Sequence, residues 1–314
     1  TAVLGLGNIG PTAAIPVMEG KALLFKELAG IDAVPVCIDA RDDASFVETV
    51  RSLAVNYAAI NLEDIAAPRC FAIERTLQEL LPIPVLHDDQ KGTAVVVVAG
   101  VINALRVKQL AKQDAKVLLY GAGAAGFSVY KLLRAWGITN IVVLDSKGVI
   151  CKYRDDLIDH KHRIATETLE YCDGKVTLAD ALVGRNIFIG LSKGNVLTKD
   201  DVALMDPEPV IFGLANPTPE IMPDEAYRGG ALLVATGRSD FPNQINNALS
   251  YPGLFKAALT FRFKTFTEAM LITAAEAIAN AVPNPTKAHF MPDLLDKSVP
   301  TQIVAAIEKS LLGN

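Results

Sequence analysis

The chain has 314 residues, of which 51% are hydrophobic and 21% are charged. This length corresponds to about two domains at the usual ~100–200 residues each, and the composition excludes a disordered chain. The formal net charge is -5, from 30 basic and 35 acidic residues. Electrostatics therefore gives no reason to expect a nucleic acid or an anionic membrane as a partner.

The cysteines and the apolar segments indicate a cytoplasmic protein. Cys37, Cys70, Cys151 and Cys172 are far apart and form no C-x-x-C pair. This spacing favours reduced thiols in a cytosolic protein over a disulfide framework or a zinc site. The sequence has no secretory signal, and its longest apolar run, 94–102, is shorter than the ~18–20 residues that a membrane span needs.

Strands and helices are predicted to alternate over the first 90 residues. A glycine-rich segment, Gly5–Gly10, precedes a helix that contains Pro11 in its first turn and extends to about Leu28. The elements that follow are a strand at 33–38, a helix near 44–55, a strand ending at Ile60, a helix near 71–81 and a strand at 83–86. Such repetition with short links predicts parallel strands covered by helices.

A second pattern of this kind follows a long apolar helix at 93–110. Its elements are a strand at 116–120, a helix at 124–136, a strand at 141–145, a polar region at 147–175 with a surface helix, and strands at 187–189, 210–212 and 232–235. The last part is predicted to be helical. A capping box, Thr265 to Glu268, begins one helix, and the spacing of Ile303, Ile307 and Leu311 predicts the packing face of another.

Acidic residues stand where two of the first predicted strands end. Glu63 and Asp64 follow one strand, and Asp88 and Asp89 follow the next. Ligands collect at the carboxyl ends of parallel strands, and carboxylate oxygens suit a hard cation such as Mg²⁺ or Mn²⁺. One such pair alone is explained as a set of helix caps. Two pairs on separate strand ends predict a divalent metal site.

Two segments match the dinucleotide-binding pattern G-x-G-x-x-G, Gly5–Gly10 and Gly121–Gly126. The pattern requires a strand before it, a helix after it and an acidic residue about 20 positions further on. The second segment meets all three requirements, because Asp145 closes the next strand 19 residues after its last glycine. The residues expected to bring the coenzyme pyrophosphate to the helix N-terminus are Gly121, Gly123, Ala124, Ala125 and Gly126.

Asp145 is expected to accept hydrogen bonds from the adenosine ribose, and its charge favours NAD by repelling the 2′-phosphate of NADP. Lys147 offsets part of that repulsion, so both coenzymes stay open. Gly5–Gly10 meets part of the same pattern, because Asp39 supplies an acidic residue further on, as a second nucleotide-binding loop would need. We interpret that segment instead as backbone that passes close to the substrate or the sheet.

The predicted fold class is therefore α/β with two domains and C-terminal helices. We expect a substrate- and metal-binding α/β domain at 1–90 and a Rossmann-type doubly wound NAD(P)-binding domain at 91–250. Residues 251–314 are expected to form helices that pack back on the core.

Seven motifs resemble the malic enzymes, and the likeness is greatest to the small bacterial-type form. It runs in order from residue 1 to about residue 255, through the motifs at 5–10, 16–21, 61–64, 87–90, 121–126, 215–220 and 237–247. Malic enzymes oxidise malate with NAD(P)⁺, decarboxylate the oxaloacetate formed and release pyruvate, using Mg²⁺ or Mn²⁺. The resemblance implies this activity, and a homodimer or larger homo-oligomer.

The resemblance also implies roles for individual residues. Glu63, Asp64 and Asp89 correspond to the metal ligands. Lys21 corresponds to the lysine that takes the proton from the C2 hydroxyl, and Asp88 to the aspartate beside it. A divalent ion disfavours a nearby ammonium, so we expect it to lower the pKa of this lysine. The amides that correspond to those holding the malate carboxylates are Asn216 and Asn246 or Asn247.

The chain departs from the family pattern at several places. The tyrosine that protonates enolpyruvate in the family lies upstream of Thr1, so we expect an N-terminal segment to have been cleaved, left disordered or omitted. Ala2 stands where some larger members carry an arginine, and Lys91 where bacterial relatives carry a histidine. Because the chain stops at Asn314, we expect no acetyltransferase-like extension.

Two other functions stay open at this point. One is a metal-dependent oxaloacetate decarboxylase without redox turnover, which would act in the absence of nucleotide. The other is a catalytically inactive nucleotide-binding relative that binds a partner, which the absent tyrosine motivates.

Overall fold

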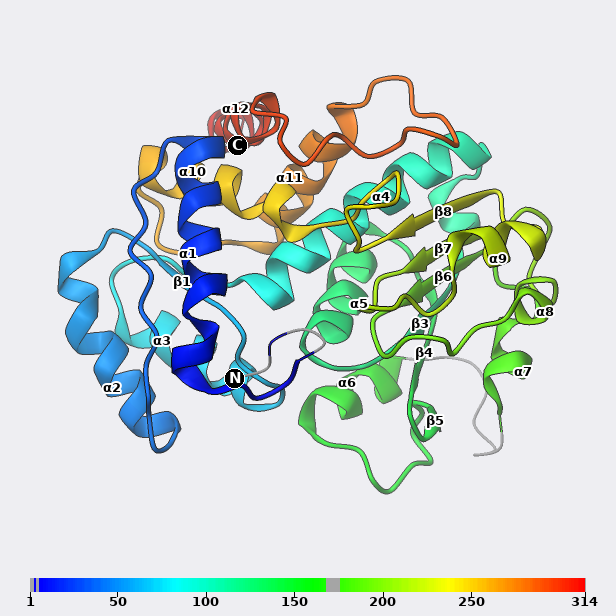
Figure 1. Cartoon of the computed structure of the whole chain (residues 1–314), viewed down its shortest axis with the longest axis horizontal. Coiled ribbons are helices and arrows are strands. Elements are labelled where there is room, and N and C mark those ends of the chain that lie inside the picture. Colours follow the sequence, from blue (N-terminus) through cyan, green and yellow to red (C-terminus); the bar gives the residue numbers. More distant parts are fainter. Residues whose placement is uncertain (1–2, 4–5, 168–175, 314) are drawn as a thin grey trace. The chain divides into compact units, whose positions relative to one another are not determined.

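A computed structural model of the chain describes residue 3, residues 6–167 and residues 176–313. It divides into two compact units, each built from segments that are distant in the sequence (Figure 1). Unit 1 comprises Thr1–Ala99, Asn246–Ala281 and Pro292–Asn314, and unit 2 comprises Gly100–Ile245 and Val282–Met291. The division into continuous domains at 1–90, 91–250 and 251–314 stays a prediction.

The N-terminal part of unit 1 contains two short parallel strands between helices. Its elements are α1 (Gly10–Ala29), α2 (Asp43–Leu53), β1 (Ile60–Leu62), α3 (Arg69–Leu80) and β2 (Val85–His87). Strands β1 and β2 pair in parallel with Leu62 opposite His87, so both carboxyl ends lie at the same edge. Helix α2 begins at a capping box in which Ser45 N–H donates to the Asp42 side chain at 2.8 Å.

The strand predicted at 33–38 is wrong, because the structure has neither helix nor strand there. Val34 and Val36 are 62% and 43% exposed, so the alternating apolar residues do not cover a core. Pro35 lies between them and has no N–H to donate to a sheet. Most of the residues before Gly5–Gly10 lie outside the described part of the chain, where Val3 forms an isolated bridge with Gly7 and α1 begins at Gly10.

The C-terminal segment adds three helices to unit 1. They are α10 (Tyr251–Phe261), α11 (Glu268–Asn280) and α12 (Ser298–Leu312), and α10 packs against both α1 and α12. The predicted capping box at Thr265 is wrong, since Thr267 caps α11 by accepting a hydrogen bond from Met270 N–H at 3.2 Å. On α12, Ile303 and Ile307 are fully buried, whereas Leu311 is 42% exposed at the end of the helix.

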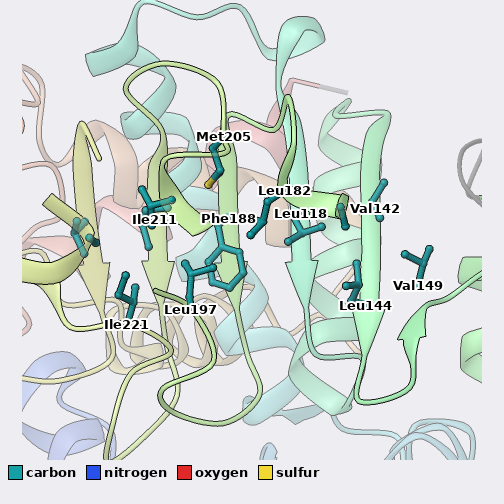
Figure 2. Packing of buried hydrophobic residues seen from close by; sticks show 14 of the residues in the cluster. Leu118, Val142, Leu144, Val149, Leu182, Phe188, Leu197, Met205, Ile211 and Ile221 are labelled. Carbon is teal, nitrogen blue, oxygen red and sulfur yellow. The ribbon is translucent and has the colours of Figure 1, made fainter. Parts of the chain in front are cut away.

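Unit 2 contains a six-stranded sheet of the doubly wound type. Its strands are β3 (Lys116–Tyr120), β4 (Asn140–Asp145), β5 (Gly148–Val149), β6 (Ile187–Gly190), β7 (Val210–Gly213) and β8 (Leu233–Thr236), in the order β5-β4-β3-β6-β7-β8. Only β5 runs antiparallel to its neighbour among these strands. Figure 2 shows Leu118, Val142, Phe188 and Ile211 from adjacent strands packing in one core. The predicted α/β class with a Rossmann-type sheet is confirmed.

Helices cover this sheet and connect its strands. They are α5 (Ala124–Trp136), α6 (Asp159–Glu167), α7 (Leu178–Leu182), α8 (Lys199–Val202) and α9 (Pro223–Arg228). Helix α5 lies directly after β3, where the glycine pattern predicts it, and α6 lies within the predicted polar region.

Helix α4 (Thr93–Lys108) is preceded by a π-helical turn, η2 (Asp88–Gly92). Together they form the one stretch among the described residues that is long and apolar enough for a membrane span, Asp88–Lys108. However, 78% of its most apolar window is buried inside the protein, as in a core helix. The turn matters more for function, because π-turns inside helices often mark functional sites.

The expectation of four reduced thiols is wrong for Cys151, which is disulfide-bonded. Cys37 and Cys70 are free, and Cys172 lies outside the described residues.

Candidate metal and coenzyme sites

Three carboxylates meet at the carboxyl ends of the two strands in unit 1. Glu63 and Asp64 directly follow β1, and Asp89 lies in the turn η2 after β2. Because the strands are parallel and in register, one ligand oxygen from each residue lies within 4.8 Å of the other two. The pairing that the sequence predicted between positions 25 residues apart is thus present in the structure.

Asp64 joins the cluster through its backbone as well as its side chain. It has φ 55°, a left-handed conformation that aspartate tolerates better than most residues. In this conformation its N–H donates a 2.8 Å hydrogen bond to Asp89 Oδ2. Burial, followed by repulsion from Asp89, raises the pKa of Asp64 to about 6. Burial and Asp89 also raise the pKa of Glu63, against the attraction of Lys21.

Lys21, on α1, lies between the metal-site carboxylates and a buried aspartate. Its ammonium is 3.1 Å from Glu63 Oε1 and donates a hydrogen bond to Asp88 Oδ2. Burial alone lowers the pKa of Lys21, but attraction by Asp88 and Glu63 outweighs burial and raises the pKa above its ordinary value. Lys21 is therefore an ammonium held by two carboxylates in the protein alone.

The polar atoms of this cluster fit a bound cation and its ligands. Asp64 Oδ2 and Asp88 Oδ1 are buried, and neither has a hydrogen-bond partner among the described residues. Buried carboxylate oxygens without partners are costly, and a divalent ion or its bound ligands would satisfy them. Asn61 Nδ2 donates to Glu63 Oε2 at 3.1 Å and helps to orient that side chain. The donor set, three carboxylates, suits Mg²⁺ or Mn²⁺.

Sequence reasoning missed Tyr251, the first residue of α10. Its ring is fully buried, and Lys21 Nζ lies 4.5 Å from the ring centroid, which is cation–π geometry. Its hydroxyl has no partner among the described residues. Burial raises the pKa of this hydroxyl, and Asp88 and Glu63 add to the rise. The available signal was its position four residues after Asn247, close to a recognised motif.

Lys91 has a structural partner. Its ammonium is 2.9 Å from Oε1 of the buried Glu74 on α3, which also accepts a hydrogen bond from His87 N–H at 2.8 Å. Lys91 therefore neutralises a buried carboxylate that fixes the end of β2. This explains a lysine beside the metal motif without giving it a role in the chemistry.

The candidate substrate amides lie in both units. Asn216 follows β7 in unit 2, and an added Cβ at Gly237 would lie 2.8 Å from its Nδ2. In unit 1, Asn246 Oδ1 is occupied by a hydrogen bond from Ala248 N–H at 2.9 Å. Asn247 begins the turn η4 (Asn247–Leu249), which contacts η2, and its side-chain amide has no partner among the described residues.

In unit 2 the loop Gly121–Gly126 joins β3 to α5 as the pattern requires. A Cβ at Gly126 would lie 2.0 Å from Gly121 O, and a Cβ at Gly121 would lie 2.4 Å from Leu191 O. Both positions therefore need glycine for close packing. A Cβ at Gly123 would meet no atom within 4 Å, so open space lies over the uncapped N-terminus of α5. This is the geometry that accepts a pyrophosphate.

Asp145 ends β4 beside this loop, since Gly121 N–H donates to the carbonyl of Leu144 at 2.8 Å. Its carboxylate is not free. Arg154 binds both oxygens, at 2.8 Å and 3.2 Å, and Lys161 lies 2.6 Å from Oδ2. Burial opposes ionisation, but these partners outweigh it and lower the pKa of Asp145.

Two protein-family models match the chain. Residues 1–78 match the model of the malic enzyme N-terminal domain, and residues 90–311 match that of the malic enzyme NAD-binding domain. The chain is 48% identical to a bifunctional malic/malolactic enzyme of Bacillus subtilis, covering 99% of the chain and 77% of that protein. It is 43% identical to an NADP-dependent malic enzyme of Halomonas elongata, covering 100% and 71%.

A solved structure is equally similar. The NAD-dependent malic enzyme of Thermotoga maritima superposes with a TM-score of 0.92 at 44% identity, covering 98% of this chain and 81% of that one. A cluster of carboxylates that could hold a metal ion, together with a Rossmann-type unit, is typical of a two-domain, NAD(P)-dependent oxidoreductase. More specifically, the chain belongs to the malic enzyme family.

Proposed function

We propose that this chain oxidises malate and decarboxylates the product to pyruvate and CO₂, with reduction of NAD⁺ or NADP⁺ and dependence on Mg²⁺ or Mn²⁺. One observation carries the proposal: Glu63, Asp64 and Asp89 offer ligand oxygens within 4.8 Å of one another, beside the buried pair of Lys21 and Asp88. The malic enzyme names of the similar proteins support the same activity.

The three carboxylates are the proposed metal ligands. Three protein oxygens leave positions in an octahedral shell for the substrate and water. When bound, the ion supplies Lewis acidity that stabilises negative charge on the C2 oxygen of the substrate. Asp64 Oδ2 is buried and has no hydrogen-bond partner among the described residues, so a bound ion would satisfy it.

Lys21 is the proposed acid–base group. As the neutral amine, the form that a bound divalent ion would favour, Lys21 would take the proton from the C2 hydroxyl when C2 loses hydride to NAD(P)⁺. After loss of CO₂, the electron pair of the broken bond would stay on the substrate as an enolate, and Lys21 would return its proton to the enolate oxygen. Conversion of this enol to pyruvate then requires a proton at C3 from a donor that we do not assign, with the hydroxyl proton passing back to Lys21. Asp88, fully buried and hydrogen-bonded to Lys21, positions the amine. That a divalent ion lowers the pKa of Lys21 stays a prediction.

Asn247 is the stronger of the two neighbouring candidates for a substrate amide. The side chain of Asn246 already accepts a hydrogen bond from Ala248 N–H, whereas that of Asn247 has no partner among the described residues. A neutral amide suits a carboxylate ligand here, because it adds donors without adding further charge to the site. Asn216 is proposed to hold the other carboxylate, as the family motif implies.

We further infer a homodimer or larger homo-oligomer in the cytoplasm. Unit 1 leaves several large apolar side chains exposed along α1 and the segment after it, which favours burial against a second copy. They are Ile15, Leu23, Val34 and Val36, with exposures of 41%, 61%, 62% and 43%. Light scattering on the purified chain tests this, and a monomer at micromolar concentration would contradict it.

The activity is tested by following NAD(P)H formation with malate and Mn²⁺, alongside measurement of pyruvate. We expect turnover that EDTA abolishes and Mn²⁺ restores. Lys21→Met should lower kcat by about 10²- to 10⁴-fold, the usual effect of losing a general acid–base group. Lys26→Met removes a lysine of the same helix whose partner is the exposed Asp32, and should leave kcat near that of the parent.

The alternatives give different results in the same assay. A decarboxylase without redox turnover would consume oxaloacetate in the absence of nucleotide and form no NAD(P)H from malate. Turnover of malate that persists in EDTA would contradict the proposed metal site. A chain that binds nucleotide yet converts neither substrate would be an inactive relative.

A further inference from the structure

Glu220 is a fully buried carboxylate in unit 2, at the edge of the sheet where β6 and β7 end. Its Oε1 accepts a 2.9 Å hydrogen bond from Ser192 N–H, and its Oε2 accepts a 3.0 Å hydrogen bond from Ala215 N–H. Ser192 lies two residues after β6, and Ala215 lies two residues after β7. One side chain thus joins the two loops that leave neighbouring parallel strands.

The surroundings of Glu220 are shaped to hold its carboxyl group. Burial raises the pKa of this group, and the N–H groups of Ala215 and Ser192 oppose the rise. Burying a carboxylate costs free energy unless its oxygens are hydrogen-bonded, and these N–H groups supply the bonds. Strand β6 ends in a glycine here, and a Cβ at Gly190 would lie 2.3 Å from Glu220 Cδ. Any side chain at this position would therefore displace the carboxyl group.

Backbone hydrogen bonds join the same two loops, but they do not reach Ala215. Asn195 N–H donates to Pro219 O, and the N–H groups of Val196 and Leu197 donate to Glu220 O, each at 3.0 Å. These bonds fix the backbone at the far end of the second loop. The start of that loop is held instead by the Glu220 side chain, which accepts the N–H of Ala215.

The residue after Ala215 is Asn216, the candidate substrate amide of unit 2. Its half-buried side chain lies against Gly237, where an added Cβ would be 2.8 Å from Asn216 Nδ2. If Ala215 moved, the backbone that carries this amide would move with it. Small misplacements of a group that holds a substrate have large effects on rate.

The loop after β6 borders the coenzyme loop. Leu191 N–H donates to Tyr120 O at 2.8 Å, and a Cβ at Gly121 would lie 2.4 Å from Leu191 O. The order of the strands changes direction between β3 and β6, and ligands of doubly wound sheets bind at such a point. Glu220 therefore links a segment packed on the coenzyme loop to the segment that carries Asn216.

From these contacts we propose that Glu220 is a positioning residue of the reaction, whose carboxylate holds Asn216 in place relative to the coenzyme loop so that this amide meets a carboxylate of malate. The inference rests on the proposed function, because Asn216 is a proposed substrate group. Glu220 acts through Asn216 and not by touching malate itself. A purely structural role would lower stability without depending on Asn216.

The experiment measures malate binding without turnover. Dissociation constants are determined by calorimetry for malate in the presence of Mn²⁺ and saturating NADH or NADPH, a reduced coenzyme that cannot accept hydride. Glu220→Gln keeps the size of the side chain but replaces one oxygen by an NH₂ group, so one of the two backbone N–H groups loses its acceptor. We expect malate affinity to fall by at least about tenfold. The affinity for NAD⁺ and NADP⁺ should stay near that of the parent, because Leu191 keeps its own bond to β3.

A double-mutant cycle shows whether Glu220 acts through Asn216. Asn216→Ala should itself weaken malate binding, and adding Glu220→Gln should then weaken it little further, because the amide to be positioned is gone. The same coupling is expected in kcat/KM for malate. Glu225→Gln is the matched control, since this glutamate also accepts a backbone N–H, from Lys199 at 3.4 Å, but it joins α9 to α8. It should leave malate affinity unchanged.

Gly190→Ala gives an independent test that leaves the glutamate in place. The added Cβ displaces the Glu220 carboxyl group without removing its charge. Malate affinity should fall as in Glu220→Gln, and this loss should also largely disappear in the Asn216→Ala background. Thermal melts of each variant measure the loss of stability separately from the loss of malate binding.

The results separate this inference from the proposed function. Parent-like malate affinity in Glu220→Gln, or additive effects of Glu220→Gln and Asn216→Ala, would overturn the positioning role, while malate oxidation by the parent would stand. If the parent bound malate without oxidising it, the proposed function would be contradicted, and the binding cycle would still decide the role of Glu220. A parent that does not bind malate at all would contradict both proposals.

Discussion

The backbone N–H of Asp64 donates a 2.8 Å hydrogen bond to the side chain of Asp89, 25 residues further along the chain. One proposed metal ligand is thus positioned by the backbone of another. The bond depends on the left-handed conformation of Asp64, with φ 55°, which few residues other than glycine, asparagine and aspartate adopt at low cost.

Two substitutions at Asp64 can therefore distinguish the loss of a metal ligand from strain in the backbone. Asp64→Asn keeps the left-handed conformation but removes one ligand charge, so Mn²⁺ affinity should fall by at least about tenfold with a small change in Tm. Asp64→Val should lose the metal and also lower Tm, because a β-branched residue is strained at this φ. Calorimetric titration with Mn²⁺ and thermal melts in EDTA check both results.

The control is Asp32→Asn, which removes an exposed carboxylate elsewhere in unit 1. It should change neither property. Asp64→Asn binding Mn²⁺ as tightly as the parent would show that Asp64 is not a ligand.

The pKa of Asp64 predicts how pH affects the metal-free protein. Burial and repulsion from Asp89 raise the pKa of Asp64 to about 6, whereas the pKa of an aspartate in an unfolded chain is about 3.9. The folded state therefore binds this proton more tightly, and the stabilisation this gives is present below about pH 4 and lost as pH rises through about 6. A divalent cation removes the repulsion between the carboxylates and competes with the proton.

The rise in Tm on adding Mn²⁺ should consequently be larger at about pH 7.5 than at about pH 5. Melts in EDTA and in Mn²⁺ across this range measure it. The dependence should weaken in Asp64→Asn. A rise in Tm that is greatest at about pH 5 would contradict the assigned pKa direction.

The parts of the site that the sequence predicted are those set by local chain patterns. Glu63 and Asp89 could be paired in advance because each lies within two residues of the end of an apolar strand, and parallel strands bring such positions to one edge. The loop Gly121–Gly126 was similarly visible, since its glycines, strand and helix are neighbours in the sequence. The same logic failed at 33–38, where apolar residues alternate as in a strand but pair with no strand among the described residues.

What sequence could not predict are contacts between segments with no shared motif. Tyr251 lies against Lys21 because α10 packs on α1, a relation between residues that are 230 positions apart. Arg154 and Lys161 cancel the charge of Asp145 from a polar region without strong periodicity. Hydrophobic patterns identify which faces are buried, but they do not specify which charged side chains meet there.

The ring and the hydroxyl of Tyr251 can be separated by mutation. Tyr251→Phe keeps the aromatic face under Lys21 and removes a buried hydroxyl that has no partner among the described residues, so Tm should be unchanged or higher. Tyr251→Leu removes the aromatic ring that Lys21 contacts. If this cation–π contact, of about 0.5–2 kcal/mol, positions the amine of Lys21, its loss should lower kcat by about 2- to 30-fold. Steady-state kinetics with malate tests the comparison.

If Tyr251→Phe loses as much activity as Tyr251→Leu while keeping its Tm, the hydroxyl rather than the ring contributes. The buried hydroxyl would then be a substrate contact. In that case KM for malate should rise more than kcat falls.

Gly92 provides a test of the position of Asp88. An added Cβ at Gly92 would lie 1.8 Å from Asp88 Oδ1 and 2.9 Å from Asp88 Cγ, so Gly92→Ala must displace the aspartate. Overpacking of this kind costs about 1–3 kcal/mol, and a displaced Asp88 would no longer hold Lys21. We expect both a lower Tm and a fall in kcat of at least about tenfold, since small misplacements of catalytic groups have large effects.

Gly20→Ala is the matched control for stability. A Cβ at Gly20 meets no atom within 4 Å, and the residue lies inside α1, where alanine is favoured over glycine by about 0.5–1 kcal/mol. Its Tm should therefore be equal to or above that of the parent. If Gly92→Ala kept full activity and stability, Asp88 could not lie beside Gly92. The proposal that Asp88 positions Lys21 would then be contradicted.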